Sequence, residues 1–305
     1  MTATAAPATS AITAPAPSPS DNQPPLRRRR NPSLHGTLSK VIIALIVIVQ
    51  VYPLAWLFIT SLRTEHDFAT GDPFALPKAI TFENYARAFE TGNLGMNILN
   101  SFVVTMGANV LIVLLGMMAA YAIQVLGFRF SRFVRGLFLI GIIVPVQIAL
   151  VPLFIDYAAI NLLDTYPSMI IPLAGFALPM SIYLFCSFFE YIPRETYEAA
   201  SLDGAGPYRI FGLITLPLSV NTVVTVVLVN SIFIWNDFIF ANTFVLSEEL
   251  KTIPLGLQNY IGAMGNVDWT ATFAAVCVTI TPLLLVFLVL NKAMIYGLEA
   301  GANKG

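Results

Sequence analysis

Residues 91–128 read TGNLGMNILNSFVVTMGANVLIVLLGMMAAYAIQVLGF, the longest stretch of the sequence without a charged side chain. Its first positions include Thr91, Gly92, Asn93 and Gly95, which are poor helix formers, so we place a helix at about 100–125. A helix that crosses a bilayer needs about 20 mostly apolar residues, because the hydrocarbon core is about 30 Å thick. The stretch is therefore predicted to span a membrane.

Five further charge-free intervals are long enough to cross a bilayer, so the sequence predicts an all-α integral membrane protein with six transmembrane helices. We place the other five helices at about 41–61, 136–156, 166–189, 219–245 and 270–291. The composition agrees, since 57% of the residues are hydrophobic, 11% are charged and the mean hydropathy is +0.76. A water-soluble domain carries about a quarter charged residues, so a soluble protein is excluded. The net charge of −1 gives no reason to expect nucleic acid as a partner.

The two ends and the first loop complete the expected organisation. Residues 1–40 are predicted to be a disordered cytoplasmic extension, because they begin with a tract rich in proline, alanine, threonine and serine. The basic run Arg27–Arg30 follows and is suited to bind anionic membrane lipid. A signal peptide is the competing interpretation, but the apolar segment 41–61 is too long for one. An extracytoplasmic loop at 62–97 and a cytoplasmic tail at 293–305 are also expected.

Lysine and arginine predict the orientation. With six spans and the amino terminus inside, the cytoplasmic side receives 12 of the 16 basic residues. Membrane proteins carry their excess of positive charge on that side, so both termini are predicted to be cytoplasmic. The 12 residues are Arg27–Arg30, Lys40, Arg129, Arg132, Arg135, Arg194, Arg209, Lys292 and Lys304, and the other four are Arg63, Lys78, Arg87 and Lys251.

No residue pattern indicates catalysis or metal binding. Cys186 and Cys277 lie in apolar runs and are interpreted as small core residues. His35 and His66 fall on opposite sides of the predicted membrane. The sequence contains no Gly-x-x-x-x-Gly-Lys-Ser/Thr, so it lacks the usual phosphate-binding loop. We therefore expect no catalytic residue, no metal ligand and no cofactor on this chain.

The most informative loop is 191–218, whose residues 193–218 read PRETYEAASLDGAGPYRIFGLITLPL. Pro193 can occupy the first turn of a helix, and Gly204 and Gly206 can form the bend that ends it. Pro207 can open a second short helix, and Pro217 is expected to stop it. The loop therefore predicts a helix–turn–helix elbow on the cytoplasmic side. The competing interpretation is a polar helix that lies on the membrane surface.

The spacing of this loop resembles a known family. Glu198-Ala199-Ala200, then Gly204 after three residues and Leu216-Pro217 some twelve positions later, resemble the signature loop of the inner-membrane permease subunits of binding-protein-dependent ABC importers. In that family the loop docks into a groove on a cytoplasmic ATPase. The resemblance implies that the ATPase-coupling residues here are Glu198, Ala199, Ala200, Asp203, Gly204, Ala205, Phe211, Leu216 and Pro217.

Further motifs over about residues 40–305 resemble the carbohydrate-uptake branch, most closely its second, maltose-type permease subunit. They are Ser61-Leu62-Arg63, Glu83-Asn84-Tyr85, Asn100-Ser101-Phe102, Trp235-Asn236-Asp237 and the ending GLEAGANKG at 297–305. Asn221 and Asn303 depart from the family pattern, but neither touches the Glu-Ala-Ala-Gly core. The resemblance implies the type-1 ABC importer permease fold, with its transmembrane domain at 97–292, in a bacterial inner membrane.

The same resemblance implies the function and the partners. The chain would form half of the pathway of an ATP-driven sugar or oligosaccharide importer, together with a homologous second permease subunit. Two separate ABC ATPase subunits would bind ATP and Mg, and an extracytoplasmic substrate-binding protein or lipoprotein would deliver the sugar. Two alternatives remain open, an ion-coupled secondary carrier of six spans and a non-transport membrane assembly subunit. Few acids lie within the spans, which argues against the carrier.

Polar residues in the spans are the remaining candidates. Trp235, Asn236 and Asp237 are candidates for the substrate path, because an indole stacks on a sugar ring and amide or carboxylate groups match its hydroxyls. The alternative for Asp237 is an acid that caps or pairs near the membrane surface. Tyr121, Gln124, Gln147 and Asn230 are interpreted instead as hydrogen bonds between helices.

Overall fold

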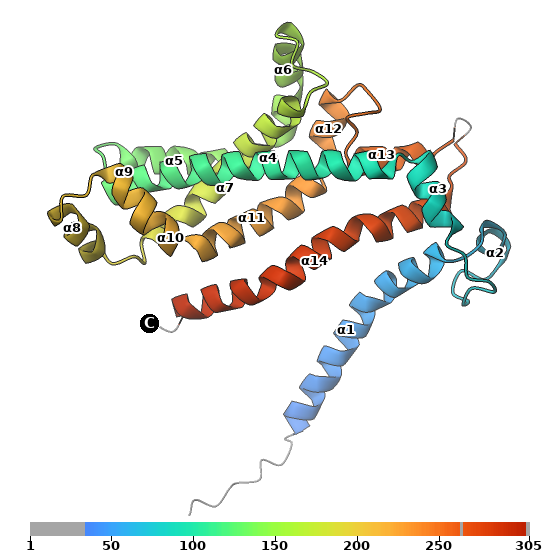
Figure 1. The fold of residues 1–305 in the computed structure, drawn as a ribbon. Coiled ribbons are helices and arrows are strands. Elements are labelled where there is room, and N and C mark those ends of the chain that lie inside the picture. The colour runs from blue at the N-terminus through green and yellow to red at the C-terminus, as the bar shows by residue number, and fades with distance from the viewer. Residues whose placement is uncertain (1–33, 263–264, 303–305) are drawn as a thin grey trace, which may run out of the picture. The chain divides into compact units, whose positions relative to one another are not determined.

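The computed structural model describes residues 34–262 and 265–302, and every regular element in those ranges is helical (Figure 1). The chain divides after Tyr52 into two units, which are described separately. The predicted extension therefore lies outside the described residues up to position 33. The described part of the first unit is the start of α1 (Leu34–Ser61), in which apolar side chains such as Ile48 and Val49 are exposed.

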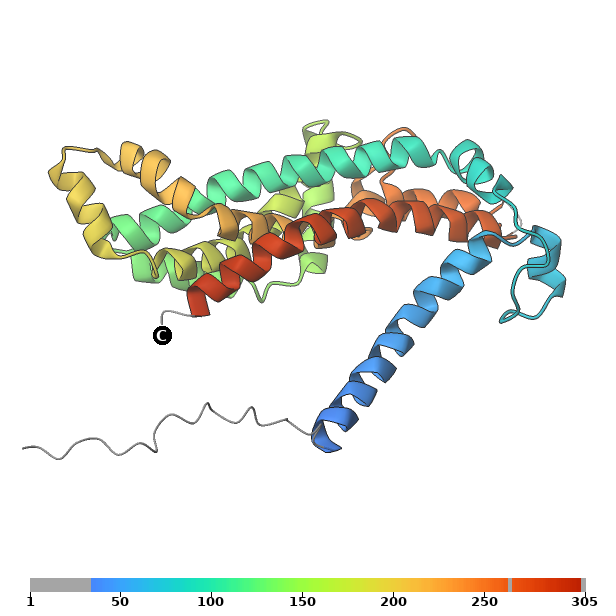
Figure 2. The same cartoon turned by 60° about the horizontal axis from the view of Figure 1, so that its bottom comes forward.

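The second unit contains a bundle of long helices. Its members are α4 (Leu94–Ala120), α5 (Ser131–Gly141), α7 (Tyr166–Phe189), α11 (Val220–Trp235) and α14 (Trp269–Ala302). Figures 1 and 2 show α4, α7 and α11 packed along one another, with α14 beside α11.

Side chains of three helices fill the core of this bundle. Ala108 and Ile112 of α4, Phe185 of α7 and Val226 of α11 are fully buried. Gly116 of α4 faces the Phe185 ring so closely that a Cβ atom there would lie 3.3 Å from it. Small residues let helix backbones approach each other in a membrane, where packing rather than water exclusion drives association.

Apolar length supports the predicted membrane protein. Four described helical stretches are long and apolar enough to cross a membrane alone, namely Leu38–Ser61, Leu94–Leu126, Tyr166–Phe189 and Trp269–Leu288. Two bent pairs also pass when each is taken together, Ser131–Gly141 with Val146–Ala159 and Pro207–Leu218 with Val220–Trp235. The described chain thus contains four spans, or six if each bent pair counts as one.

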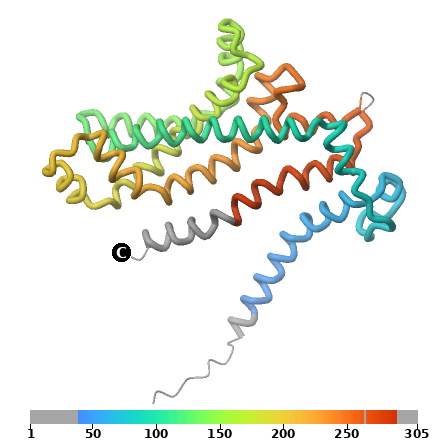
Figure 3. The backbone as a smooth tube through the Cα atoms, in the orientation of Figure 1, coloured from blue at the N-terminus to red at the C-terminus, as the bar shows by residue number. Residues whose placement is uncertain are grey.

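The span predicted at 136–156 is two helices rather than one. α5 ends at Gly141, α6 (Val146–Ala159) begins after Pro145, and the two axes differ by 94°. Pro145 is extended, with ψ 128°, and a proline also disfavours helical geometry in the residue before it. Figure 3 follows the chain through this break, where α6 leaves the line of α5.

The span predicted at 219–245 is also divided. α11 ends at Trp235, and a short helix, α12 (Ile239–Phe244), follows. The Asp237 carboxylate accepts hydrogen bonds from the N–H groups of Phe240 (3.1 Å) and Ala241 (3.3 Å), so it caps α12. A side chain that satisfies these first N–H groups starts a new helix at this point.

The second predicted span is nearer to expectation. α4 begins at Leu94, six residues before the expected start, after Asn93 in the left-handed region (φ 52°). It continues into a π-helical turn, η1 (Tyr121–Leu126), so the helical stretch ends at the expected place. The span predicted at 166–189 coincides with α7. The span predicted at 270–291 lies within the longer α14.

Short helices gather at one end of the bundle, which we call the loop end. They are α2 (Glu65–Thr70), α3 (Glu83–Thr91), α12, α13 (Ile253–Gly256) and the 3₁₀ turn η3 (Leu257–Tyr260). Asn100, fully buried near the start of α4, donates from its amide to the Glu249 (2.7 Å) and Lys251 (2.9 Å) carbonyls, so α4 is anchored here.

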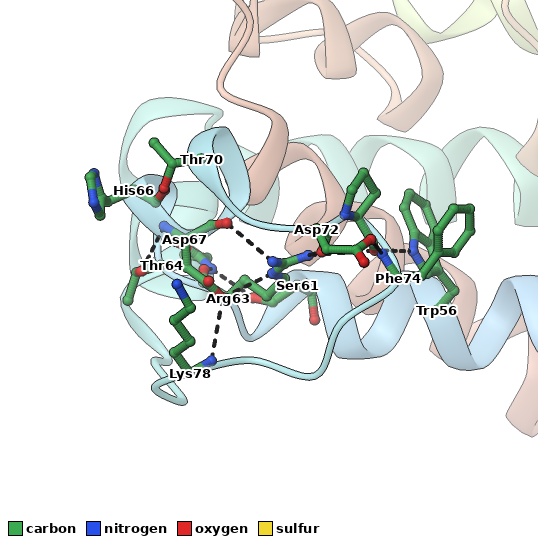
Figure 4. Close-up of polar contacts among 12 residues, drawn as sticks. Trp56, Ser61, Arg63, Thr64, His66, Asp67, Thr70, Asp72, Phe74 and Lys78 are labelled. Carbon is green, nitrogen blue, oxygen red and sulfur yellow. Dashed lines mark hydrogen bonds and ion pairs between the residues drawn. The ribbon is translucent and has the colours of Figure 1, made fainter.

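A buried arginine organises the chain after α1 (Figure 4). Arg63 is 1% exposed, and its Nε donates to Asp67 Oδ2 at 3.0 Å, while Nη1 and Nη2 donate to the Asp72 (3.0 Å) and Asp67 (3.1 Å) carbonyls. The Asn84 amide donates to the Arg63 carbonyl at 2.7 Å. Arg63 thus joins α2 and the following loop through its guanidinium, and α3 through its backbone carbonyl.

Candidate functional site

The loop at the opposite end of the bundle folds as a helix–turn–helix, as the sequence predicts, and we call it the elbow. Its first arm is α8 (Arg194–Leu202), and its second consists of α9 (Pro207–Ile210), the π-helical turn η2 (Phe211–Thr215) and α10 (Leu216–Leu218). Figures 1 and 2 show it at the left end, away from α3 and α13.

The turn between the arms depends on Gly204. The Ala205 N–H donates to the Ala200 carbonyl at 3.0 Å, and the Gly204 N–H donates to the Ser201 carbonyl at 3.1 Å. These two bonds form the Schellman motif, which needs a left-handed residue at the Gly204 position. Gly204 has φ +81°, whereas the second predicted bend residue, Gly206, has φ −72°, which any residue can adopt. The bend therefore requires only the first of the two glycines.

Pro217 does not stop the second arm, contrary to the prediction. It lies inside α10, and the helical stretch ends after Leu218, where the chain bends by 71° into α11. Proline lacks the N–H that would bond to a carbonyl one turn earlier. The wider π-helical turn η2 ends at Thr215, two residues before Pro217, so the backbone register has already changed where the N–H is missing.

One face of the elbow packs on the bundle. Ala200, Ala205 and Phe211 are half-buried against the main core, and Ile210 is buried. On the bundle side, this contact includes Tyr121, the first residue of η1, whose ring lies 5.2 Å from the Phe211 ring. Three of the nine predicted coupling residues therefore contact this chain itself.

The other face of the elbow is exposed. It presents the remaining six predicted coupling residues, Glu198, Ala199, Asp203, Gly204, Leu216 and Pro217. It also presents Leu202 and Tyr208, each 88% exposed, which the sequence analysis did not single out. Leu202 is an apolar residue in an otherwise mostly polar short helix, which is a signal in the sequence. Whether its side chain faces the bundle or the solvent cannot be predicted without knowing where the bundle lies.

A hollow of about 610 Å³ separates α8 from the end of η1. Tyr121, Leu126 and Tyr197 line it, together with Glu198 and Leu202. A neighbouring hollow of about 620 Å³ is lined by polar side chains that include Gln124, Glu190 and Arg194. The first arm of the elbow is thus held by few contacts on its inner side.

The three substrate-path candidates make different hydrogen bonds. The Trp235 indole N–H donates to the Thr279 carbonyl at 3.2 Å, which joins α11 to α14. Asn236 is exposed, and its amide donates to the Ile232 carbonyl in the preceding turn. Asp237 caps α12, so its contacts are those of the alternative interpretation, a capping acid.

Three of the four residues predicted to make interhelical hydrogen bonds do so. The Gln124 side-chain oxygen accepts from Arg135 of α5 at 3.4 Å. The Asn230 amide donates to the Ser181 hydroxyl at 3.1 Å, which joins α11 to α7. The Tyr121 hydroxyl donates to the Pro207 carbonyl at 3.0 Å, which joins η1 to α9. The elbow is therefore connected to α4 by a hydrogen bond as well as by a ring contact.

Comparison with known proteins places these features in a family. Residues 112–295 match the family described as binding-protein-dependent transport system inner membrane component, and this range includes the whole elbow. The chain is 32% identical over 267 residues to the diacetylchitobiose uptake system permease protein NgcG of Streptomyces coelicolor, which covers 87% of this chain and 88% of the relative. It is 33% identical over 271 residues to the trehalose transport system permease protein SugB of Mycobacterium tuberculosis, covering 88% and 98%.

A solved structure supports the fold. The model resembles one chain of a bacterial ABC transporter involved in the import of the acidic polysaccharide alginate, with a TM-score of 0.70. The identity is 22%, and the match covers 86% of this chain and 97% of that chain.

Proposed function

The chain belongs to the family of binding-protein-dependent transport system inner membrane components, and we propose that it is the permease subunit of an ATP-driven sugar or oligosaccharide importer. Permeases of this family are transport components rather than enzymes. The sugar class is supported by the relatives, whose names specify diacetylchitobiose and trehalose. The family gives no support to an ion-coupled carrier or to an assembly subunit.

The observation that carries the proposal is the exposed face of the elbow. Leu202 of α8 and Tyr208 of α9, each 88% exposed, are the two most exposed large hydrophobic side chains of the described chain. They lie close together in sequence on the elbow and not along an apolar span, so we infer that a partner surface covers them. Glu198, Ala199 and Asp203 on the same face form a polar border with small side chains. The proposed partner is a cytoplasmic ATPase subunit that binds ATP and Mg, with Leu202 and Tyr208 as its apolar contacts.

The other partners follow from this assignment. A homologous permease subunit completes the pathway, a second ATPase subunit pairs with the first, and an extracytoplasmic binding protein delivers the sugar at the loop end. The chain crosses the bacterial inner membrane six times, with both termini and the elbow in the cytoplasm. Closure of the ATPases on ATP displaces the elbows and switches the pathway between its two openings. Trp235 remains the better candidate for a sugar contact, because an indole that donates its N–H elsewhere still offers a ring face.

The experiment is uptake of labelled trehalose, maltose and diacetylchitobiose by proteoliposomes that contain this chain, its partner permease and both ATPases. We expect uptake of at least one sugar that requires internal ATP and the binding protein and survives collapse of ion gradients. Uptake that follows the ion gradient without ATP would contradict the proposal.

Docking is tested by Leu202→Glu and Tyr208→Glu. Each places a charge in the proposed apolar contact, so we expect less ATPase to co-purify with the permease and uptake to fall at least tenfold. Leu246→Glu is the matched control, because Leu246 is 71% exposed in a loop at the opposite end. Equal amounts of co-purified ATPase in all three variants would exclude this face as the docking surface.

A further inference from the structure

Tyr121 lies where the two π-helical turns of the described chain meet. η1 begins at Tyr121 and η2 begins at Phe211, and the rings of these two first residues are 5.2 Å apart with their planes at 59°. π-helical turns are rare, and they recur at functional sites because they widen the backbone by one residue. Each of these turns adjoins the elbow, one in the second arm and one in the bundle.

The hydrogen bond from Tyr121 reaches the elbow at its turn. Its hydroxyl donates to the carbonyl of Pro207, the first residue after the Gly204–Gly206 bend, and the same carbonyl accepts the Phe211 N–H. Tyr121 is 6% exposed, whereas Pro207 is exposed, so this bond is half-buried at the edge of the hollow that both residues line. A displacement of α9 changes this bond of η1 directly.

Few other contacts compete with this one. The hollow of about 610 Å³ lies between α8 and η1, and at both Gly204 and Gly206 an added Cβ would meet nothing within 4 Å. Nothing therefore crowds the two glycines of the turn. The elbow is attached through Ile210 and Phe211 in its second arm, through Ala200 and Ala205 beside the turn, and through the hydrogen bond from Tyr121.

α4 carries the connection across the molecule. It runs without interruption from Leu94 to η1, and the Asn109 amide in its middle donates to the Ser231 hydroxyl of α11 at 3.1 Å. At its other end Asn100 holds the loop between α12 and α13 through the Glu249 and Lys251 carbonyls. A shift of η1 is thus transmitted to α11 and to the loop end.

We propose that Tyr121 is a positioning residue that joins the elbow to α4, with η1 and η2 as the two joints. This inference rests on the proposed function, since it assigns the route by which movement of the docked ATPase reaches the pathway. The expected defect is a loss of coupling, in which ATP is hydrolysed while less sugar moves.

The test compares Tyr121→Phe with Tyr157→Phe in the reconstituted complex described above. Tyr157 is a matched control, because it is 7% exposed and its ring lies 5.2 Å from the Phe244 ring at 54°, so it makes the same kind of ring contact with α12 instead of the elbow. The readout is sugar taken up per ATP hydrolysed, with the labelled sugar that supports uptake by the unaltered complex.

We expect Tyr121→Phe to lower this ratio about fivefold, the factor that one neutral hydrogen bond typically provides, while Tyr157→Phe leaves it unchanged. Phe211→Leu is expected to lower it as well. The double variant Tyr121→Phe/Phe211→Leu should be less impaired than two independent defects predict, because both changes act at one contact.

An unchanged ratio in Tyr121→Phe would overturn the proposal, and so would equal losses of uptake and hydrolysis, which indicate poorer assembly rather than lost coupling. Failure of the proposed function gives a different result, since the unaltered complex would then show no ATP-dependent uptake.

Discussion

At Gly204 a single backbone angle decides the shape of the elbow. Alanine at φ +81° is strained by roughly 1–2 kcal/mol, because its Cβ approaches the neighbouring carbonyl. Gly204→Ala is therefore expected to weaken the Schellman turn, misdirect α8 and reduce ATPase co-purification and uptake. Gly206→Ala is the control, because Gly206 has φ −72° and equally open surroundings. Equal effects of the two alanines would show that the left-handed turn is not what docking requires.

Gly71 is the second glycine at which an added methyl group is expected to destabilise the fold. A Cβ there would lie 2.5 Å from the Asp67 carbonyl and 2.7 Å from Arg63 Nη2, and Arg63 is buried with no room to move away. Gly71→Ala is expected to destabilise the segment after α1 by about 1–3 kcal/mol, the usual cost of overpacking.

Faster limited proteolysis between α1 and α3 would report the effect of Gly71→Ala. Gly95→Ala is the control, since its added methyl group would be no closer than 3.9 Å to a neighbour. If both variants resist the protease as well as the unaltered chain, the Arg63 network is not rigid.

The residues of the elbow show how far sequence alone reaches. Gly204 could be predicted because a bend after Glu-Ala-Ala needs a residue without a side chain. The division of the elbow into two faces could not, because the residue that decides it, Tyr121, is 86 positions from Pro207. For the same reason, the family resemblance alone implies that Phe211 contacts the ATPase, whereas in the structure its ring packs on Tyr121.

Among the elements, the segment of α2 and its flanking loops is expected to respond to acid. The hydrogen bond from Arg63 holds the pKa of Asp67 below its ordinary value of 3.8, and the Lys78 N–H bond adds to this effect against the cost of burial. Because the folded-state pKa is lowered, ionised Asp67 stabilises the fold above the unfolded pKa, and this stability is lost as the pH falls through the folded value. The acid-sensitive window therefore lies below 3.8.

Hydrogen exchange over residues 62–82, corrected for its intrinsic pH dependence, measures this response. We expect protection that is constant from pH 7 to 5 and falls below pH 4. Asp67→Asn should reduce protection at pH 7 and remove most of the acid dependence, whereas Glu65→Gln, at an exposed position of α2, should behave as the unaltered chain. A segment that opens in acid to the same degree in Asp67→Asn would assign the response to another group.

The broken spans show what apolar length leaves undecided. Proline does not mark the breaks, because Pro172 and Pro179 lie inside the continuous α7, whereas Pro145 separates α5 from α6. Neighbouring helices decide whether the freed backbone groups are satisfied within a helix or the helix divides. The second division depends on Asp237, whose cap forms only when the chain turns into α12. The charge-free intervals could therefore predict where spans lie but not which of them are bent.

For the whole molecule, hydrogen bonds decide whether the pair α5–α6 crosses the bundle or returns. Tyr121, in the π-helical turn η1 that precedes α5, bonds to Pro207 of the elbow. Asp164, just after α6, accepts from the Leu246 (2.9 Å) and Ser247 (3.0 Å) N–H groups at the loop end. The pair starts at one end and finishes at the other, which favours one bent span over a re-entrant loop. By length and composition the described chain has four spans, or six if each bent pair counts as one.

Six spans with the elbow inside make a prediction about sidedness, which single cysteines test. In a chain with Cys186 and Cys277 replaced by alanine, we introduce Phe130→Cys, Ile160→Cys, Leu202→Cys or Leu246→Cys, all at exposed positions. A membrane-impermeant maleimide should label Ile160→Cys and Leu246→Cys on intact cells, and Phe130→Cys and Leu202→Cys only after permeabilisation. This order follows from the predicted orientation, which assigns 12 of the 16 Lys and Arg residues to the elbow side.

Each departure from that order has one meaning. The reverse order would invert the orientation and place the elbow where no cytoplasmic ATPase reaches it, so the proposed function would fail with it. Labelling of Phe130→Cys and Ile160→Cys from the same side would make α5–α6 re-entrant, despite the contacts at both of its ends. Either result is independent of the sugar, because the reagent reports only on which side of the membrane each residue lies.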